Sequence, residues 1–162
     1  MTSKEDYLKQ MDTHLYSQAE SINDQLKLIE TELHEFLDFS SIDKLINLNK
    51  HIDIEYVQAI FREFRYLAVY CGEGRNAIDK LIQSKNVEQD IVDRVYKGIY
   101  RKCVLEFFSP KDEVWYEDSR ASYRNKCSID FQTDPSDPIV QTMEKIEPYF
   151  HKLREDLDYL EC

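Results

Sequence analysis

The chain has 162 residues, of which 42% are hydrophobic and 33% are charged, and this predicts a single domain over 1–162 with one core. Its net charge of −11 argues against binding to nucleic acid or to anionic lipid, because both require a positive surface. With only 3 glycines and 4 prolines, the chain favours long helices joined by few turns.

The first predicted helix covers residues 4–38, where apolar residues recur in steps of three and four. They are Leu8, Met11, Leu15, Ala19, Ile22, Leu26, Ile29, Leu33 and Phe36. A stripe of this length is typical of a coiled-coil seam or of one face of a bundle helix. Similar stripes on the later segments favour the bundle. A short helix is expected from Ile42 to about Leu48, with a serine before it as the cap.

The second long helix is predicted over 53–84, and Gly72-Glu73-Gly74 lies inside it. These glycines indicate a kink, a bulge or a place of close packing, because each costs a helix about 1 kcal/mol relative to alanine. A third helix is predicted over 87–108, and Pro110 ends its helical pattern.

The segment after Ser109 is predicted to form a short helix over 110–123 and then a short extended piece over 127–131. The last helix is predicted to begin at Asp137-Pro138, with a kink where Pro148 falls inside its apolar stripe. The predicted fold is therefore all-α: a four-helix bundle in which residues 109–137 form an irregular, aromatic-rich crossover or cap between the third and last long helices.

Residues 103–131 hold the only tryptophan and mix aromatic residues with charges of both signs. Such a mixture on an irregular segment is typical of a recognition surface, since rings give shape and polar groups give orientation. The alternative interpretation is that Trp115, Phe107 and Phe108 complete the helical core while the charges pair at the surface. The sequence leaves both open.

The same segment resembles a known family. The runs FFSPK at 107–111, VWYEDSR at 114–120 and SIDF at 128–131, with Tyr123 between them, resemble the YpuI-like family of small uncharacterised proteins from Bacillus and related bacteria. The similarity extends more weakly to 64–71 and 153–157. The resemblance implies a bacterial cytoplasmic source, and it implies no reaction.

The start of the chain also predicts a cytoplasmic protein without membrane association. The first residues, MTSKEDYLKQM, lack the apolar core of a signal peptide, and no apolar run reaches membrane-spanning length. The four cysteines show no Cys-x-x-Cys spacing, so reduced thiols are expected.

No motif assigns a catalytic residue, a metal or a cofactor. The paired Glu-x-x-His motif of di-iron bundles is missing, although Glu30 with His34 and Glu147 with His151 are spaced by four residues. Phosphate-binding loops, nucleophile elbows and zinc spacings are also missing from the sequence. We therefore expect no metal and no cofactor, and the catalytic residues stay unassigned.

Two functional hypotheses remain. The favoured one is a non-catalytic interaction or adaptor module, in which the aromatic and charged cap binds a protein partner or a second copy of the chain. The alternative is a site at the cap for a small anionic ligand, either a binding protein or an enzyme, with Arg124 among the arginines and Glu117 or Asp118 as acid or base. The candidate site residues are Arg65, Arg101, Trp115, Tyr116, Glu117, Asp118, Arg120 and Tyr123.

Overall fold

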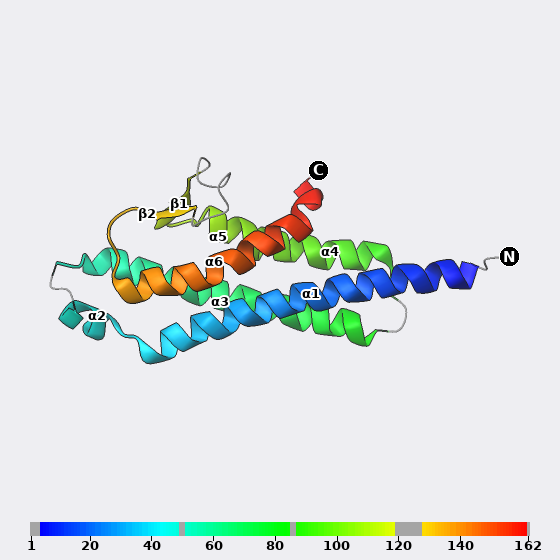
Figure 1. The fold of residues 1–162 in the computed structure, drawn as a ribbon, viewed down its shortest axis with the longest axis horizontal. Coiled ribbons are helices and arrows are strands. Elements are labelled where there is room, and N and C mark those ends of the chain that lie inside the picture. The colour runs from blue at the N-terminus through cyan, green and yellow to red at the C-terminus, as the bar shows by residue number, and fades with distance from the viewer. Residues whose placement is uncertain (1–3, 49–50, 85–86, 119–127, 162) are drawn as a thin grey trace.

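The computed structural model describes residues 4–48, 51–84, 87–118 and 128–161, and its side chains are described over 16–160 outside the same gaps. The protein is mostly helical, with a small two-stranded sheet (Figure 1). The elements are α1 (Lys4–Phe39), α2 (Ile42–Leu48), α3 (Ile54–Gln83), α4 (Gln89–Ile99), the π-helical η1 (Tyr100–Leu105), α5 (Glu106–Phe108), β1 (Trp115–Glu117), β2 (Ile129–Phe131), α6 (Asp137–Leu157) and the 3-10 turn η3 (Asp158–Glu161).

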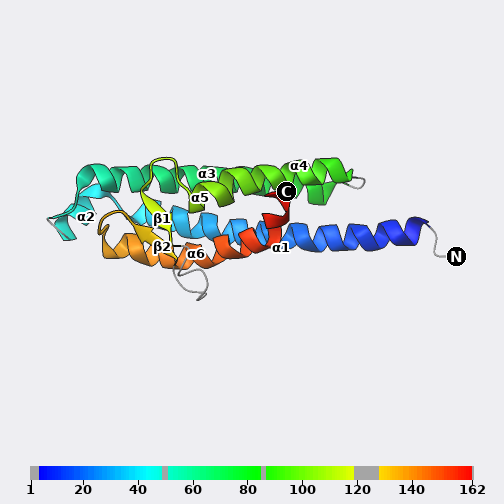
Figure 2. The same ribbon diagram turned by 90° about the horizontal axis from the view of Figure 1, so that it is seen from above.

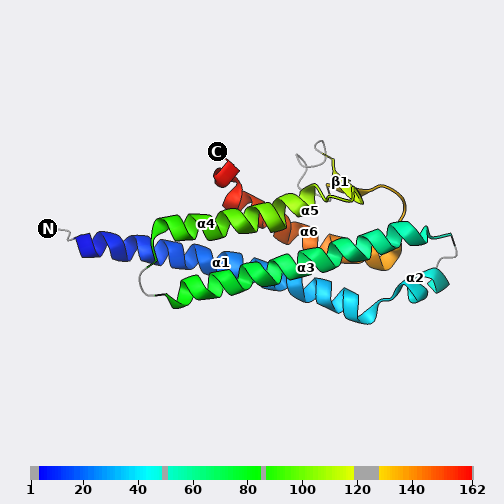
Figure 3. The ribbon, with the colours of Figure 1, turned by 180° about the vertical axis from the view of Figure 1, so that it is seen from behind.

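The long helices lie side by side along the molecule, with α1 packed mainly on α3 and α6 (Figures 1 and 3). The predicted stripe of α1 faces inward from Ala19 to Phe36, where all its members are buried. The serine cap predicted for α2 is confirmed, because Ser41 Oγ accepts the Lys44 N–H at 3.2 Å, and at the start of α3 the Asp53 side chain accepts the Tyr56 N–H at 3.3 Å. The helical boundaries predicted for α1, α2 and α3 are confirmed within about one residue.

The third helical segment contains a feature that its sequence pattern did not predict. After α4 the backbone continues as the π-helix η1 and then as α5 without leaving helical dihedral angles. The wider π turn brings Tyr100, Cys103 and Val104 into the core, together with Phe107 and Phe108 of α5. Because α5 ends at Phe108, the third helical segment does not reach the end of the molecule at which α3 and α6 begin (Figure 2).

A β-hairpin lies where the third helical segment stops. β1 and β2 pair antiparallel with Trp115 opposite Phe131, and they lie alongside α3 and α6 rather than beyond the helix ends (Figures 1 and 2). The prediction of a short helix over 110–123 is therefore wrong for Trp115–Glu117, which form a strand, and residues 119–127 lie outside the described residues. The extended piece predicted over 127–131 is confirmed over Ile129–Phe131.

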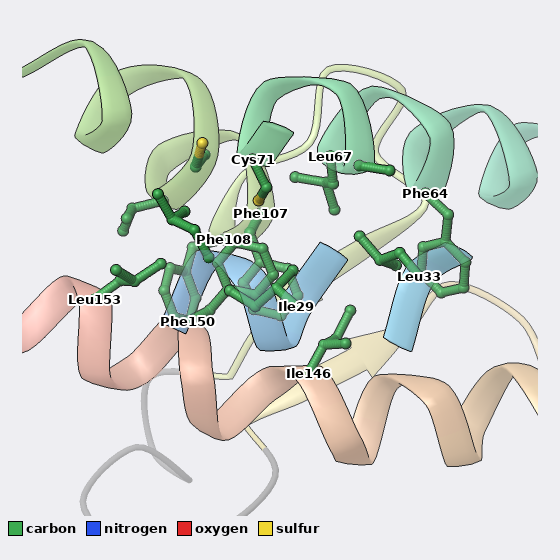
Figure 4. Packing of buried hydrophobic residues seen from close by; sticks show 14 of the residues in the cluster. Ile29, Leu33, Phe64, Leu67, Cys71, Phe107, Phe108, Ile146, Phe150 and Leu153 are labelled. Atoms are coloured by element: carbon green, nitrogen blue, oxygen red, sulfur yellow. The ribbon is translucent and has the colours of Figure 1, made fainter. Parts of the chain in front are cut away.

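The core brings rings from several elements together (Figure 4). Phe107 of α5 stacks on Phe150 of α6, with ring centroids 3.9 Å apart and planes 5° from parallel. Leu33 of α1 and Leu67 of α3 are both fully buried in this cluster. α6 continues through Pro148, so the helix does not stop there; the kink at this proline stays a prediction.

Gly74 lies where α3 packs closely on its neighbours. A Cβ atom at this position would lie 3.2 Å from both Ile99 Cγ1 and Leu26 Cδ1. The glycine therefore lets α3 approach α1 and α4 closely, which confirms close packing as the reason for it. Among the described helices, none is long and apolar enough to cross a membrane.

Candidate functional site

The hairpin places two neighbouring aromatic residues on opposite faces, as the alternation of a strand requires. Trp115 is 1% exposed, and its Nε1–H donates to the Phe107 carbonyl at 2.7 Å. Its ring lies 5.8 Å from Phe64 on α3 and 6.0 Å from Phe107, measured between centroids. Tyr116 points outward and is 49% exposed. Trp115 thus anchors the hairpin, while Tyr116 is presented to solvent.

A tyrosine on α3 fixes the open end of the hairpin. The Tyr56 hydroxyl donates to the Val114 carbonyl at 2.5 Å and accepts the Gln132 N–H at 3.1 Å. The same Gln132 N–H also contacts the Val114 carbonyl at 3.3 Å. Both strands are therefore tied to α3 at one point, in addition to the packing of Trp115.

A buried carboxylate on α6 holds the second strand. Glu147 is 3% exposed, and its carboxylate accepts the Ser128 N–H at 2.8 Å and the Ile129 N–H at 3.3 Å. Burial alone would raise the pKa of Glu147, but the hydrogen bonds from His151 and from the two backbone N–H groups outweigh it and hold the pKa below its usual value. The charged form of Glu147 is thus the form that the fold stabilises.

The proton on His151 is placed by its neighbours. Arg154 Nη2 lies 3.2 Å from His151 Nδ1, and a guanidinium can only donate, so Nδ1 accepts. Nε2 therefore carries the proton of the neutral ring and donates it to Glu147 Oε2 at 3.0 Å. This tautomer makes His151 a donor on the side that faces the hairpin.

Glu117 at the end of β1 is bound by Arg154 of α6. Arg154 Nη1 donates to Glu117 Oε1 at 2.8 Å, and Nη2 lies 2.8 Å from Oε2, which gives a two-pronged ion pair. The guanidinium carbon also lies 3.8 Å from the centroid of the Phe108 ring. Each strand is thereby held to α6 by its own carboxylate contact.

The arrangement of Ser128, His151 and Glu147 resembles the residue types of a hydrolase triad but not its geometry. Ser128 Oγ and Glu147 Oε2 both lie on the Nε2 side of His151, at 3.2 Å and 3.0 Å. In a working triad the acid binds the other ring nitrogen, so that Nε2 is free to accept the serine proton. Here Nε2 already donates, and Ser128 is fully buried. The arrangement anchors the hairpin and supplies no activated nucleophile.

A hollow of about 710 Å³ lies along β1. Its lining comes from the chain before the strand, from the strand itself and from the end of β2: Phe108, Ser109, Pro110, Lys111, Glu113, Trp115, Tyr116, Glu117 and Gln132. Among its described lining residues the charged side chains are Lys111, Glu113 and Glu117, and Glu117 is already paired with Arg154. The described part of the lining therefore has a mixed polar character without an excess of positive charge.

The structure separates the residues that the sequence grouped as one site. Arg65 is exposed on α3, with its guanidinium 5.8 Å from the Phe61 ring centroid, and Arg101 is exposed on η1. Neither arginine lines the hollow beside Trp115. The half-buried Asp118 donates its N–H to the Ser128 carbonyl at 2.6 Å. Three further candidates lie outside the described residues: Arg120, Tyr123 and Arg124.

Several of the residues that anchor the hairpin on α6 were not predicted from the sequence. Glu147 and His151 were noticed only as a pair spaced by four residues, and Ser128 and Arg154 were not singled out. A signal exists for Glu147, because it falls on the buried side of α6 between Ile146 and Phe150. A carboxylate on an apolar stripe requires a partner, and that requirement predicts a polar contact without naming it.

A second buried carboxylate was missed in the same way. Glu63 of α3 is 1% exposed and lies on the buried side between Ile60 and Leu67. Burial raises the pKa of Glu63 to about 8, and the nearby Glu106 of α5 adds a smaller effect in the same direction. Over the part of the chain that the structure describes, no three His, Cys, Asp or Glu side chains are arranged to hold a metal ion.

These features define a mostly helical protein with a hairpin anchored on its flank by buried carboxylates. A family model described as "Protein of unknown function (DUF3907)" matches residues 19–162, and the chain belongs to this family. It is similar to the "Uncharacterized protein YpuI" of Bacillus subtilis (strain 168), with 25% identity over 146 residues, which cover 90% of this chain and 81% of that protein. The predicted resemblance is thereby confirmed. No solved structure matches the chain.

Proposed function

We propose that this protein is a non-catalytic interaction module that binds a protein partner through the outer face of its hairpin. The observation that carries the proposal is Tyr116, which is 49% exposed on a strand whose opposite face is fully buried at Trp115. Tyrosine, tryptophan and arginine dominate the binding energy of protein interfaces. Tyr116 is the aromatic residue of β1 that is available for such a contact.

The anchoring of the hairpin favours binding because little order has to be created on contact. The hairpin is held to α3 and α6 by hydrogen bonds of 2.5 to 3.3 Å from Tyr56, Glu147 and Arg154. Ordering a flexible side chain at an interface costs about 0.5–1.5 kcal/mol. A strand that is already fixed avoids part of that cost. The hollow that Tyr116 lines could also accept a side chain of the partner.

The helical part serves in this proposal as a rigid frame. We regard it as a four-helix bundle formed by α1, α3, α6 and the α4–η1–α5 segment, and we regard the chain as a single domain. The support is one continuous buried cluster to which all four segments contribute. The proposed location is the bacterial cytoplasm, which fits the two buried free thiols Cys71 and Cys103.

The alternative, a site for a small anionic ligand beside Trp115, has weaker support. The hollow is large enough for a small molecule at about 710 Å³. However, its charged side chains are Lys111, Glu113 and Glu117, and Glu117 already binds Arg154. Among the described lining residues, Lys111 would face the anion and Glu113 would oppose it.

A photo-crosslinking experiment tests the proposal directly. The full chain carries a benzophenone amino acid in place of Tyr116 and is expressed in its own source organism, and crosslinked species are identified by mass spectrometry. We expect one dominant adduct with a defined protein, and competition by unlabelled wild-type protein should reduce it. An adduct of twice the chain mass identifies a second copy as the partner.

Tyr66 supplies the matched control. It is also 49% exposed, but it lies on α3 and stacks on Tyr70, with ring centroids 6.4 Å apart. The same amino acid placed at Tyr66 should not give the adduct. Equal adducts from Tyr116 and Tyr66, or no defined adduct from Tyr116, would contradict the proposal.

A further inference from the structure

The register of the hairpin decides in which direction the backbone groups of β1 point. At one end of the pair the Asp118 N–H donates to the Ser128 carbonyl at 2.6 Å, and at the other end the Gln132 N–H donates to the Val114 carbonyl at 3.3 Å. In an antiparallel pair every second residue directs its N–H and C=O towards the partner strand, and the residues between them direct theirs away. The even-numbered residues from 114 to 118 therefore face β2, and the odd-numbered residues face the outer edge.

The outer edge of β1 carries backbone groups without partners. These are the N–H and C=O groups of Trp115 and Glu117, since β1 belongs to a two-stranded sheet whose other strand lies on the opposite side. Among the residues that the structure describes, none donates to these carbonyls or accepts from these N–H groups. An open strand edge of this kind is a ready template for pairing with another chain.

The outer edge of β2 is covered at its start. The register directs the Ile129 N–H away from β1, and Glu147 Oε1 of α6 accepts it at 3.3 Å. The Ser128 N–H, one residue earlier, donates to the other oxygen of the same carboxylate at 2.8 Å. A helix side chain thus occupies this edge where β2 begins, and β1 offers the accessible edge of the hairpin.

The hollow along β1 gives room for a further segment. All three residues of the strand, Trp115–Glu117, line it together with residues 108–111 of the chain before the strand, and its volume is about 710 Å³. This volume lies in the range of about 300–1,000 Å³ that ligand pockets span. A strand of 3 residues extends over about 10 Å, so the segment that fits along it is short and extended.

We propose that β1 binds an extended segment of the protein partner as a third strand, hydrogen-bonded to the N–H and C=O groups of Trp115 and Glu117. The inference rests on the proposed function, because the same hairpin is the binding surface, and it names how the partner is held. In recognition of this kind the main-chain hydrogen bonds supply affinity, and the alternating side chains of the added strand supply specificity.

The position of Tyr116 sets the chemistry of the bound segment. Tyr116 is 49% exposed on the outer face, so the residue of the added strand that lies beside it is exposed on the same face. A β-branched or aromatic side chain is favoured there, because such cross-strand pairs stabilise a sheet. Proline is excluded at the positions that donate to β1, since it has no N–H.

Amide hydrogen exchange of the free, full-length chain tests the open edge without any partner. The Glu117 N–H should exchange at least about tenfold faster than the N–H groups of Tyr116 and Asp118, which the register directs to β2. Equal protection of Glu117 and its two neighbours would show that the edge is already covered, and would overturn the inference.

A binding experiment tests the added strand itself. The probes are short peptides selected from a displayed random library on the full-length chain. Ligation at the native residues Cys103 and Cys127 gives the natural sequence with an ester in place of the Glu117 amide, which removes its N–H and keeps its side chain. We expect the selected peptides to bind this chain about tenfold more weakly than the all-amide chain, and to bind Tyr116→Ala more weakly as well.

An ester at Asp112 supplies the matched control. Its N–H lies in the exposed turn before β1 and has no hydrogen-bond partner among the described residues, so its loss should leave the affinity unchanged. In the all-amide chain, addition of a selected peptide should slow the exchange of the Glu117 N–H and not that of the Asp112 N–H. This second readout holds if the ester at Glu117 does not fold.

The outcomes separate this inference from the proposed function. Unchanged affinity with the ester at Glu117, unchanged exchange of its N–H on peptide binding, or selection of no binding peptide would each overturn the added strand. A defined crosslink from Tyr116 alongside any of these results would leave the interaction module standing. Conversely, peptides that require the Glu117 N–H, without a defined crosslink from Tyr116, would support the open edge and contradict the proposed protein partner.

Discussion

Glu117 and Arg154 lie 37 residues apart in the chain and form a two-pronged ion pair, with both N···O distances at 2.8 Å. Glu117 was a candidate acid or base at the level of sequence, and the structure shows its carboxylate occupied by a guanidinium. The pair joins the end of β1 to α6, and the Phe108 ring lies under the guanidinium at 3.8 Å. Glu117 therefore positions the hairpin on α6.

Arg154→Lys should weaken this joint without removing its charge. Lysine cannot form the two parallel hydrogen bonds and does not stack on Phe108 in the same way. Because both side chains are partly exposed, at 29% and 22%, we expect a loss of only about 1 kcal/mol in the free energy of unfolding. Urea denaturation measures it, with Lys152→Gln, on the exposed side of the same helix, as a control close to wild type. A wild-type midpoint for Arg154→Lys would show that the pair does not stabilise the fold.

Glu147→Gln should cost more, because its carboxylate is buried. The new amide group would face the Ser128 and Ile129 N–H groups with a donor in place of one acceptor oxygen, at a cost of about 2 kcal/mol near neutral pH. Glu144→Gln, one turn earlier and exposed, is the matched control. Equal stabilities of the two variants would mean that Glu147 does not hold the second strand.

The effect of Glu147→Gln should depend on pH in a defined direction. The pKa of Glu147 is lowered in the folded state, so its contribution is present above the ordinary carboxyl pKa and is lost as the pH falls through the folded value. The stability curves of wild type and Glu147→Gln should therefore converge in acid. A constant difference from neutral pH down to about pH 2 would contradict the assignment.

Glu63 should produce the opposite pH dependence. Its folded pKa of about 8 exceeds the ordinary value of 4.5, so its stabilising contribution is fully present below 4.5 and is lost as the pH rises towards 8. Wild-type stability should fall over this window by on the order of 1 kcal/mol per pH unit. Glu63→Gln should lack this slope when the free energy of unfolding is measured at several pH values. An identical slope in both proteins would assign the effect to other groups.

Two glycines give a test of the helix packing. A Cβ at Gly74 would lie 3.2 Å from Leu26 and Ile99 side chains, whereas a Cβ at Gly98 would meet nothing within 4 Å. Gly98→Ala should stabilise the protein by about 0.5–1 kcal/mol through helix propensity alone. Gly74→Ala gains the same propensity but overpacks the core, which costs about 1–3 kcal/mol. Thermal unfolding should therefore separate the two variants, and equal shifts would contradict the packing described.

The helices were predictable because their information is local. The stripe of α1 repeats with the helical period from Leu8 to Phe36, and the helix extends over the predicted range. Two structures in the third helical segment and the chain after it were not predicted: the π-helix of η1 and the strand at Trp115–Glu117. A π turn inserts one residue without a compositional mark. A strand of 3 residues is too short to show an alternation that differs from an irregular segment.

The site was predictable only in part, because its contacts join distant parts of the chain. Trp115 and Tyr116 could be singled out by residue type, but their opposite orientations result from pairing with β2. Ser128 meets Glu147 across 19 residues, and no spacing rule connects them. The carboxylates Glu63 and Glu147 do carry a sequence signal, since each interrupts an apolar stripe. That signal indicates a buried charge and leaves its partner unnamed.

The most direct test of the central claim is the affinity of the crosslinked partner for three versions of the chain, measured by isothermal titration calorimetry. We predict that Tyr116→Ala binds at least about tenfold more weakly than wild type, which corresponds to about 1.4 kcal/mol. Tyr66→Ala, which removes an equally exposed ring from α3, should bind like wild type. Wild-type affinity for Tyr116→Ala would contradict the claim that the outer face of the hairpin is the binding surface.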